Sequence, residues 1–180
     1  MLSGNRVVLQ PIEPEHLPNY VRWFADPDVL SYFGVYRPLN LASEQAWYEA
    51  QNKDTSMVNF ACEFEGRHIG GCGLFRINHA QQNAEVGLLI GEKALWDQGL
   101  GKDILQTIVS YGFDYLNLHR IYLRVFADNA RAVHAYEQVG FVCEGRFREA
   151  EWRHGRWHDL VIMSVLRHEW HSPDLHRLEK

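Results

Sequence analysis

Cysteine is scarce in this chain of 180 residues, which holds three cysteines and no C-x-x-C pair. Cys62, Cys72 and Cys143 are therefore too few and too far apart for a disulfide framework or a cysteine zinc site. Long apolar runs are also missing. The longest strongly apolar stretch, residues 86–90, is far shorter than the ~20 residues of a membrane-spanning helix, and residues 1–10 lack the apolar centre of a signal peptide. These absences predict a soluble, cytoplasmic protein with reduced thiols.

The chain also lacks an excess of positive charge and any flexible linker. Its 18 Lys and Arg residues against 23 Asp and Glu residues give a formal net charge of −5, which argues against nucleic-acid binding on a basic surface. No Pro-, Gly- or Ser-rich stretch divides the chain, and no block repeats at a fixed period. We therefore expect a single domain over residues 1–180, with a core from about 5 to 170 and a short tail at 171–180. Neither a nucleic acid nor a membrane is expected as a partner.

What the chain does contain is a mixed series of strand and helix patterns. The spacing of apolar residues predicts, in order, a strand around Val7 and Leu9, helices over 14–25 and 43–53, a hairpin of strands 58–64 and 68–78, a strand over 84–90, a helix over 100–116, a strand over 121–125, a helix over 130–139 and strands over 141–153 and 157–166. The apolar run in 84–90 indicates a central strand covered on both faces. The expected fold class is α/β, with a mixed, mostly antiparallel central sheet of about six to seven strands flanked by about four helices. One parallel crossover runs through the long helix.

The most informative segment is residues 96–102, W-D-Q-G-L-G-K, between the central strand and the long helix. Two glycines let the backbone approach a ligand closely, and the free N–H groups at the start of a helix attract an anion. A P-loop would need glycine at Trp96 and Ser or Thr at Asp103, and a dinucleotide fingerprint would need glycine at Ile104. The segment therefore predicts a pyrophosphate cradle of another kind, with Lys102 adding charge. A simple glycine turn before a helix is the alternative.

A second informative segment begins about thirty residues later. Asn129 stands at the N-cap position of a predicted helix, and Tyr136 follows seven residues on, nearly two helical turns, so that both side chains share one face. They are either a pair of site residues, or a helix cap and a core residue.

Together, W-x-x-G-x-G before a helix and D-N-x-x-A-x-x-x-Y-E-x-x-G-F resemble the acetyl-coenzyme A site of the GNAT superfamily of N-acetyltransferases. The pattern is most similar to the subgroup of ribosomal-protein alanine and spermidine acetyltransferases. The resemblance implies the GNAT fold, acetyl-coenzyme A as cosubstrate, no metal, and a homodimer as one expected assembly. It also implies acetyl transfer by direct attack of a primary amine on the thioester, the amine being a protein N-terminus or a small amine such as a polyamine. A catalytically inactive sensor or scaffold that binds acyl-coenzyme A is the alternative.

The same resemblance implies roles for individual residues. Backbone N–H groups of residues 98–102 would hold the pyrophosphate, and the strand end together with the N-cap asparagine would bind the pantetheine arm. The residues expected to bind the cofactor are thus Leu88, Leu89, Ile90, Gln98, Gly99, Leu100, Gly101, Lys102 and Asn129. Tyr136 matches the tyrosine that acts as general acid and protonates the coenzyme A thiolate.

The base and the acceptor site are less sharply defined. Glu85 matches an acidic position of the subgroup and is the candidate base, although a strand-end carboxylate paired with an arginine explains it equally well. His134 is a second candidate base. The acceptor would lie between the loop after the first helix and the final hairpin, where the candidates are Arg22, Trp23, Tyr32, Tyr36, Phe147, Glu149, Glu151, Trp152, Trp157 and Asp159. Cross-strand packing is the alternative for the hairpin aromatics.

Overall fold

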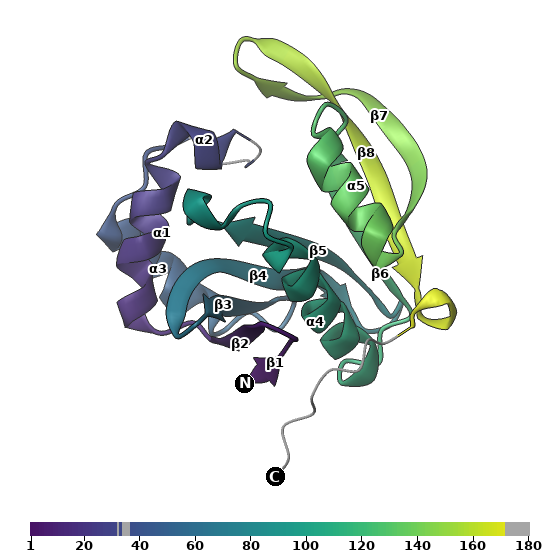
Figure 1. Cartoon of the computed structure of the whole chain (residues 1–180), viewed down its shortest axis with the longest axis horizontal. Helices are drawn as coiled ribbons and strands as arrows, with labels where there is room; N and C mark the ends of the chain where they lie inside the picture. The colour runs from purple at the N-terminus through teal and green to yellow at the C-terminus, as the bar shows by residue number, and fades with distance from the viewer. Residues whose placement is uncertain (32, 34–36, 172–180) are drawn as a thin grey trace.

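The computed structural model describes residues 1–31, 33 and 37–171 of the chain (Figure 1). Its strands form one sheet of eight, in the order β1-β2-β3-β4-β5-β6-β8-β7. The strands are β1 (Leu2–Ser3), β2 (Val7–Pro11), β3 (Val58–Phe64), β4 (Arg67–Asn78), β5 (Asn83–Ile90), β6 (Arg120–Phe126), β7 (Val142–Arg153) and β8 (Arg156–Leu166). The α-helices are α1 (Leu17–Phe24), α2 (Pro27–Leu30), α3 (Leu41–Gln51), α4 (Leu100–Asp114) and α5 (Ala130–Val139). Only β5 and β6 pair in parallel.

The predicted α/β fold class and the parallel crossover through the long helix are confirmed, while the predicted numbers of strands and helices were too low. The extra strand is β1, whose two residues pair with β2 and are too few to show a period. The extra helix is α2, which starts after Asp26 because the Asp26 carboxylate accepts a hydrogen bond from the backbone N–H of Asp28 at 3.0 Å. Within the described ranges, no helix has the length and apolar content needed to cross a bilayer.

Helices cover both faces of the sheet, and neighbouring residues of one strand point to opposite faces. Cys62 of β3 belongs to the larger core, which is filled by the apolar side of α4. Ala61, the residue before it, packs instead with Leu17 and Trp23 of α1. The sheet is therefore the middle layer between α1 with α3 and α4 with α5.

The feature that positions the site is a fork between β5 and β6. The two strands pair only from Asn83↔Arg120 to Glu85↔Tyr122. Beyond Glu85, β5 continues to pair with β4 on its other edge, but residues 86–90 have no described strand along the edge that faces β6. Figure 1 shows the resulting divergence between the half that contains β1 to β5 and the half that contains β6, β7, β8 and α5.

The β7–β8 hairpin extends past the rest of the sheet (Figure 1). Its predicted turn at His154 and Gly155 is confirmed, because both residues have positive φ, 49° and 74°. Near the tip, Arg153 Nη1 donates a hydrogen bond to the carbonyl oxygen of Leu30 at 2.5 Å. The tip of the hairpin is thus tied to the end of α2.

Candidate active site

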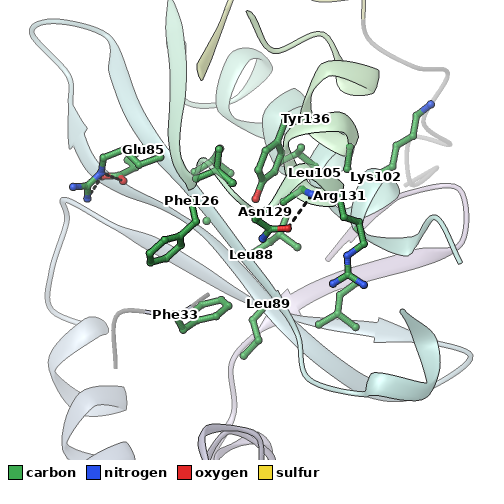
Figure 2. Close-up of a pocket in the computed structure, with 18 of the residues that line it drawn as sticks. Phe33, Glu85, Leu88, Leu89, Lys102, Leu105, Phe126, Asn129, Arg131 and Tyr136 are labelled. Carbon is green, nitrogen blue, oxygen red and sulfur yellow. Dashed lines mark hydrogen bonds and ion pairs between the residues drawn. The ribbon is translucent and has the colours of Figure 1, made fainter. Parts of the chain in front are cut away.

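A cavity of about 800 Å³ lies where β5 and β6 diverge. This volume is within the range of small-molecule sites. Among the segments that line it are three that contain predicted site residues (Figure 2). They are the end of β5 with Leu88, Leu89 and Ile90, the start of α4 with Gly99, Gly101 and Lys102, and α5 with Asn129, Arg131 and Tyr136. The fold therefore brings together the two motifs that the sequence set about thirty residues apart.

The expectation that β5 is covered on both faces was wrong for its second half. Leu89 is 7% exposed and packs in the α1 cluster, but Leu88 and Ile90 are only half-buried and form a wall of the cavity. The apolar run was read as a doubly buried strand because a cavity wall and a core contact both need apolar side chains. The Ile90 carbonyl oxygen accepts a hydrogen bond from the Trp96 indole at 2.8 Å, which holds the loop before α4 against the strand end.

The glycine segment has the backbone shape that the sequence suggested. Asp97 and Gly99 both have positive φ, 60° and 79°, and Gly99 is the N-cap residue of α4. Nothing lies within 4 Å of the place where a Cβ of Gly99 would be, so glycine is needed there for its conformation and not for lack of space. The N-terminus of α4, with its unpaired N–H groups, opens onto the cavity beside Gly101.

The residues of this segment contribute unequally. The side chain of Leu100 is buried in the core, and the Gln98 amide donates a hydrogen bond to the Ala94 carbonyl at 2.9 Å, so neither side chain lines the cavity. Lys102 lines it, but its ammonium group points away from the cavity's centre (Figure 2). The prediction that residues 98–102 hold a pyrophosphate thus depends on backbone N–H groups.

Arg131 is a site residue that the sequence reasoning missed. Its guanidinium lies 5.0 Å from the centre of the Trp96 ring and 3.3 Å from the Asp97 carboxylate. It also lines the cavity from the first turn of α5. Arg131 therefore links the glycine segment to α5 and adds a positive charge beside the α4 N-terminus. Its place between Asn129 and Ala132 of the second motif was the available signal.

The interpretation of Asn129 as a helix cap and of Tyr136 as a packed residue is confirmed, and their role as a pair of site residues stays a prediction. Asn129 caps α5, since its Oδ1 accepts the backbone N–H of Ala132 at 3.2 Å, and Tyr136 packs against Phe141 with ring centres 6.1 Å apart. Both also line the cavity, and the Tyr136 hydroxyl points into it near Asn129 (Figure 2). Burial raises the pKa of Tyr136 to about 12. The phenol therefore keeps its proton at neutral pH and is a hydrogen-bond donor.

Glu85 stands at the vertex of the fork with two arginine partners. Its Oε1 accepts a hydrogen bond from Arg124 Nε at 2.8 Å, and its Oε2 accepts one from Arg124 Nη2 at 3.3 Å and another from Arg76 Nη1. The interpretation as a strand-end carboxylate paired with an arginine is confirmed, and a role as base stays a prediction. His134, the second candidate base, is exposed on α5 and is not among the cavity-lining residues.

Most of the residues predicted to contact the acceptor do not line the cavity. Of the hairpin candidates, Glu151 lines the cavity, whereas Trp152 and Trp157 pack against each other with ring centres 5.3 Å apart, as the alternative expected. Arg22 is paired with Glu92 outside the cavity, and Tyr32 and Tyr36 lie outside the described residues.

Apolar walls also line the cavity, and none of their residues is among the predicted catalytic or cofactor-binding residues. They are formed by Val29, Phe33, Met57, Phe75, Phe126 and Leu160. In residues 1–31, 33 and 37–171, no three or more His, Cys, Asp or Glu side chains are grouped so that they could hold a metal ion.

Known proteins resemble this chain in sequence and in fold. A family model described as an acetyltransferase (GNAT) domain matches residues 6–142. The spermidine N(1)-acetyltransferase of Escherichia coli K12 is 28% identical over 171 residues, which cover 94% of this chain and 91% of that protein. The putative ribosomal N-acetyltransferase YdaF of Bacillus subtilis is 26% identical over 123 residues, 68% of this chain and 67% of that protein. The crystal structure of the Vibrio cholerae spermidine N-acetyltransferase with CoA and spermine has a TM-score of 0.86 at 27% identity, covering 91% of this chain and 97% of that one.

Proposed function

This chain belongs to the GNAT family of acetyltransferases, and we propose that its cavity binds acetyl-coenzyme A and passes the acetyl group to a primary amine. The observation that carries the proposal is the convergence of three features on one cavity. These are the free edge of β5, the N-terminus of α4 and the hydroxyl of Tyr136. The first two features suit the binding of the cofactor, and the hydroxyl suits protonation of the leaving thiolate.

The cofactor needs a pyrophosphate site and a partner for its amide-containing arm. The α4 N-terminus after Gly99 supplies N–H groups and the positive end of a helix dipole, and Arg131, which is paired with Asp97, adds a guanidinium group at the same rim. The β5 edge over residues 86–90 leaves backbone groups that pair with the amides of an extended arm, as an added strand would. Leu88 and Ile90 give this arm an apolar wall.

The chemical step forms a bond between the amine nitrogen and the thioester carbonyl carbon and then breaks the carbon–sulfur bond. The leaving thiolate takes up a proton, and the amine nitrogen releases one. Tyr136, which keeps its proton at neutral pH because burial raises its pKa to about 12, donates a hydrogen bond to the sulfur and transfers its proton to it as the carbon–sulfur bond breaks. The proton that the amine releases passes to water, and water returns a proton to the phenolate. Asn129 holds the arm beside Tyr136.

We assign Glu85 a role in receiving the amine. Its carboxylate lines the cavity and is fixed by Arg124 and Arg76, so that it offers a fixed negative charge to an incoming ammonium group. Whether it also removes the proton of the amine is a separate prediction. A homodimer likewise stays a prediction, for which light scattering of the purified chain is the measurement.

The experiment that tests the function combines an acceptor panel with a binding measurement. The full chain is incubated with acetyl-coenzyme A and N-terminal peptides, polyamines, amino acids or simple monoamines, and free thiol is followed over time. Thiol release that depends on one of the amines is the expected result. Absence of thiol release with every amine, together with absence of coenzyme A binding by calorimetry, would overturn the proposal. Binding without any transfer would instead indicate the sensor or scaffold.

A further inference from the structure

We infer that the acceptor is a primary amine that carries a single positive charge on an apolar or aromatic body, and not a polyamine. The inference rests on the proposed function and concerns the end of the cavity around Glu85, away from Lys102 (Figure 2). Two observations carry it, the apolar walls of this end and the pairing of its carboxylates.

The walls of this end are rings and aliphatic side chains from several elements. Phe126 is the last residue of β6, Phe33 lies between α2 and α3, and the two rings reach into the same part of the cavity (Figure 2). Phe75 of β4 lies over Gly87, where a Cβ would be 3.2 Å from its ring. Because Gly87 has no side chain, the Phe75 ring has room to lie at the cavity wall. Such walls favour burial of an aromatic or aliphatic group, and they offer an ammonium group only ring faces and no anionic partner of their own.

The carboxylates that line the cavity already face cations. Asp28 is paired with Lys93 at 2.8 Å and Asp97 with Arg131 at 3.3 Å. Glu85 is paired with Arg124 and Arg76. The remaining carboxylate, Glu151, interacts electrostatically with Arg124. The pKa of the Arg124 guanidinium is raised mainly by Glu85 and additionally by Glu151.

In the part of the chain that the structure describes, the cavity therefore has no carboxylate without a positive neighbour. A second ammonium group in this cavity would be removed from water without a free counter-charge, which is costly.

Arg76 also places a positive charge in this part of the cavity, which repels the ammonium groups of an acceptor. It has a positive φ of 52° and stands where the register between β4 and β5 is irregular, after Phe75. A bulge of this kind re-aims a side chain, and here it places the guanidinium beside Glu85. Two guanidinium groups thus face the one carboxylate that would receive the amine. The cluster of Glu85, Arg124 and Arg76 has a net positive charge, so every additional ammonium group on the acceptor adds to the repulsion.

The first test compares two acceptors in the full chain with saturating acetyl-coenzyme A. The kcat/KM for 2-phenylethylamine should exceed that for spermidine by at least about tenfold. Burial of the phenyl ring raises the first value, an ammonium group without a counter-charge lowers the second, and either effect is large enough for this ratio. An equal or higher value for spermidine overturns the inference and leaves the proposed function intact. Activity with neither amine also overturns it. Coenzyme A binding by calorimetry then shows whether the cofactor site has failed as well.

The second test changes the charge beside Glu85. Arg76→Gln should raise the ratio of spermidine to 2-phenylethylamine kcat/KM by about fivefold, since one repulsive charge is removed. The matched control is Arg67→Gln on the same strand, because Arg67 is exposed and lies outside the cavity lining, and it should leave the ratio unchanged. If Arg76→Gln leaves the ratio of the two kcat/KM values unchanged, the charge argument is wrong. If the unmodified chain shows no transfer to any amine, the proposed function is contradicted instead.

Discussion

Glu85 of β5 and Arg124 of β6 bridge the two parallel strands at the place where their pairing ends. The Arg124 guanidinium donates hydrogen bonds to both oxygens of the Glu85 carboxylate, at 2.8 and 3.3 Å, and Glu85↔Tyr122 is the last pair of the ladder. The bridge thus joins the two arms of the fork at the end of the cavity where we propose that the acceptor binds. A strand pair that opens to admit a cofactor is held together at its vertex by this contact.

Removal of the charge at Glu85 tests whether the bridge or proton transfer is its main role. We expect Glu85→Gln to lower the free energy of unfolding by about 1 kcal/mol, as for a partly exposed ion pair. The shape of the pH profile of kcat/KM should remain that of the unmodified enzyme. Arg124→Gln should have a similar effect, and the double variant should cost less than the sum, because both changes break one contact. A fall in kcat of about 10²- to 10⁴-fold with loss of the acidic limb of the profile would identify Glu85 as the base instead.

Tyr136→Phe separates chemistry from cofactor binding. The variant keeps the ring that packs against Phe141 and removes only the hydroxyl that points into the cavity. We expect kcat to fall by about 10²- to 10⁴-fold, the usual contribution of a general acid, while the Kd of coenzyme A changes little. A kcat within threefold of the unmodified enzyme would show that another group protonates the thiolate.

The pH dependence gives a second check on the same residue. Burial raises the pKa of Tyr136 from its ordinary value near 10 to about 12, so the folded protein holds the phenol protonated. The stability linked to this raised pKa is present below pH ~10 and is lost as the pH rises towards 12. Activity should accordingly show no loss assigned to Tyr136 between pH 7 and pH 10.

The elements of the fold were largely predictable, because their signals are local. The apolar stripe of α4 repeats over fifteen residues, and the alternation in β3 and β4 with a turn at Glu65 and Gly66 defines a hairpin. The fork between β5 and β6 was not predictable. It depends on where two strands separated by all of α4 stop pairing, and no local period records that point.

The charged residues of the site were hidden for a related reason. Arg131, in the first turn of a helix, has the sequence signature of a solvated residue, and only the fold brings it to Trp96 and Asp97. The apolar run of β5 was ambiguous in the same way, since Leu88 and Ile90 line a cavity that a doubly buried strand would not have. Chemistry at a site depends on such long-range neighbours, whereas motifs report only residue types and spacing.

His68 should make the protein less stable in mild acid. Its ring packs among His16, Tyr20 and Trp23, where Nε2 donates to the Gly70 carbonyl at 2.9 Å and Nδ1 accepts from the Asn19 amide at 3.1 Å. Burial, and secondly the charge of His16, lower its pKa from 6.5 to about 4. Because the unfolded chain binds the proton more readily, the stability linked to His68 is complete above pH 6.5 and is lost as the pH falls towards 4.

The measurement is urea unfolding of the unmodified chain and of His68→Gln at pH 7 and pH 4.5. We expect the unmodified chain to lose about 2 kcal/mol more between the two pH values than the variant, after allowance for the partial exposure of the ring. Other groups titrate in both proteins and cancel in this difference. An equal loss in both would mean that His68 is protonated in the folded state without cost.

Asp103 connects the start of the chain to the helix that opens the cofactor site. Its carboxylate is 6% exposed and accepts backbone N–H groups of Asn5 at 2.9 Å, Arg6 at 2.7 Å and Val7 at 3.0 Å. Gly4 permits this approach, since a Cβ there would be 2.7 Å from the carboxylate. Asp103→Asn would replace one acceptor oxygen by an amide NH₂ that faces a backbone donor.

We expect Asp103→Asn to lower the free energy of unfolding by about 2–3 kcal/mol, because hydrogen bonds to a charged acceptor are lost and a buried donor is left unpaired. For a chain of this size the melting temperature should fall by about 5–10 °C. Amide exchange at residues 5–7 should quicken. Asp114→Asn, which changes an exposed carboxylate at the other end of α4, is the control and should change stability by less than about 0.5 kcal/mol.

Since Asp103 lies in the first turn of α4, four residues after Gly99, a weaker anchor there should also raise the KM for acetyl-coenzyme A. An unchanged KM in a destabilised variant would show that the α4 N-terminus keeps its place without this contact.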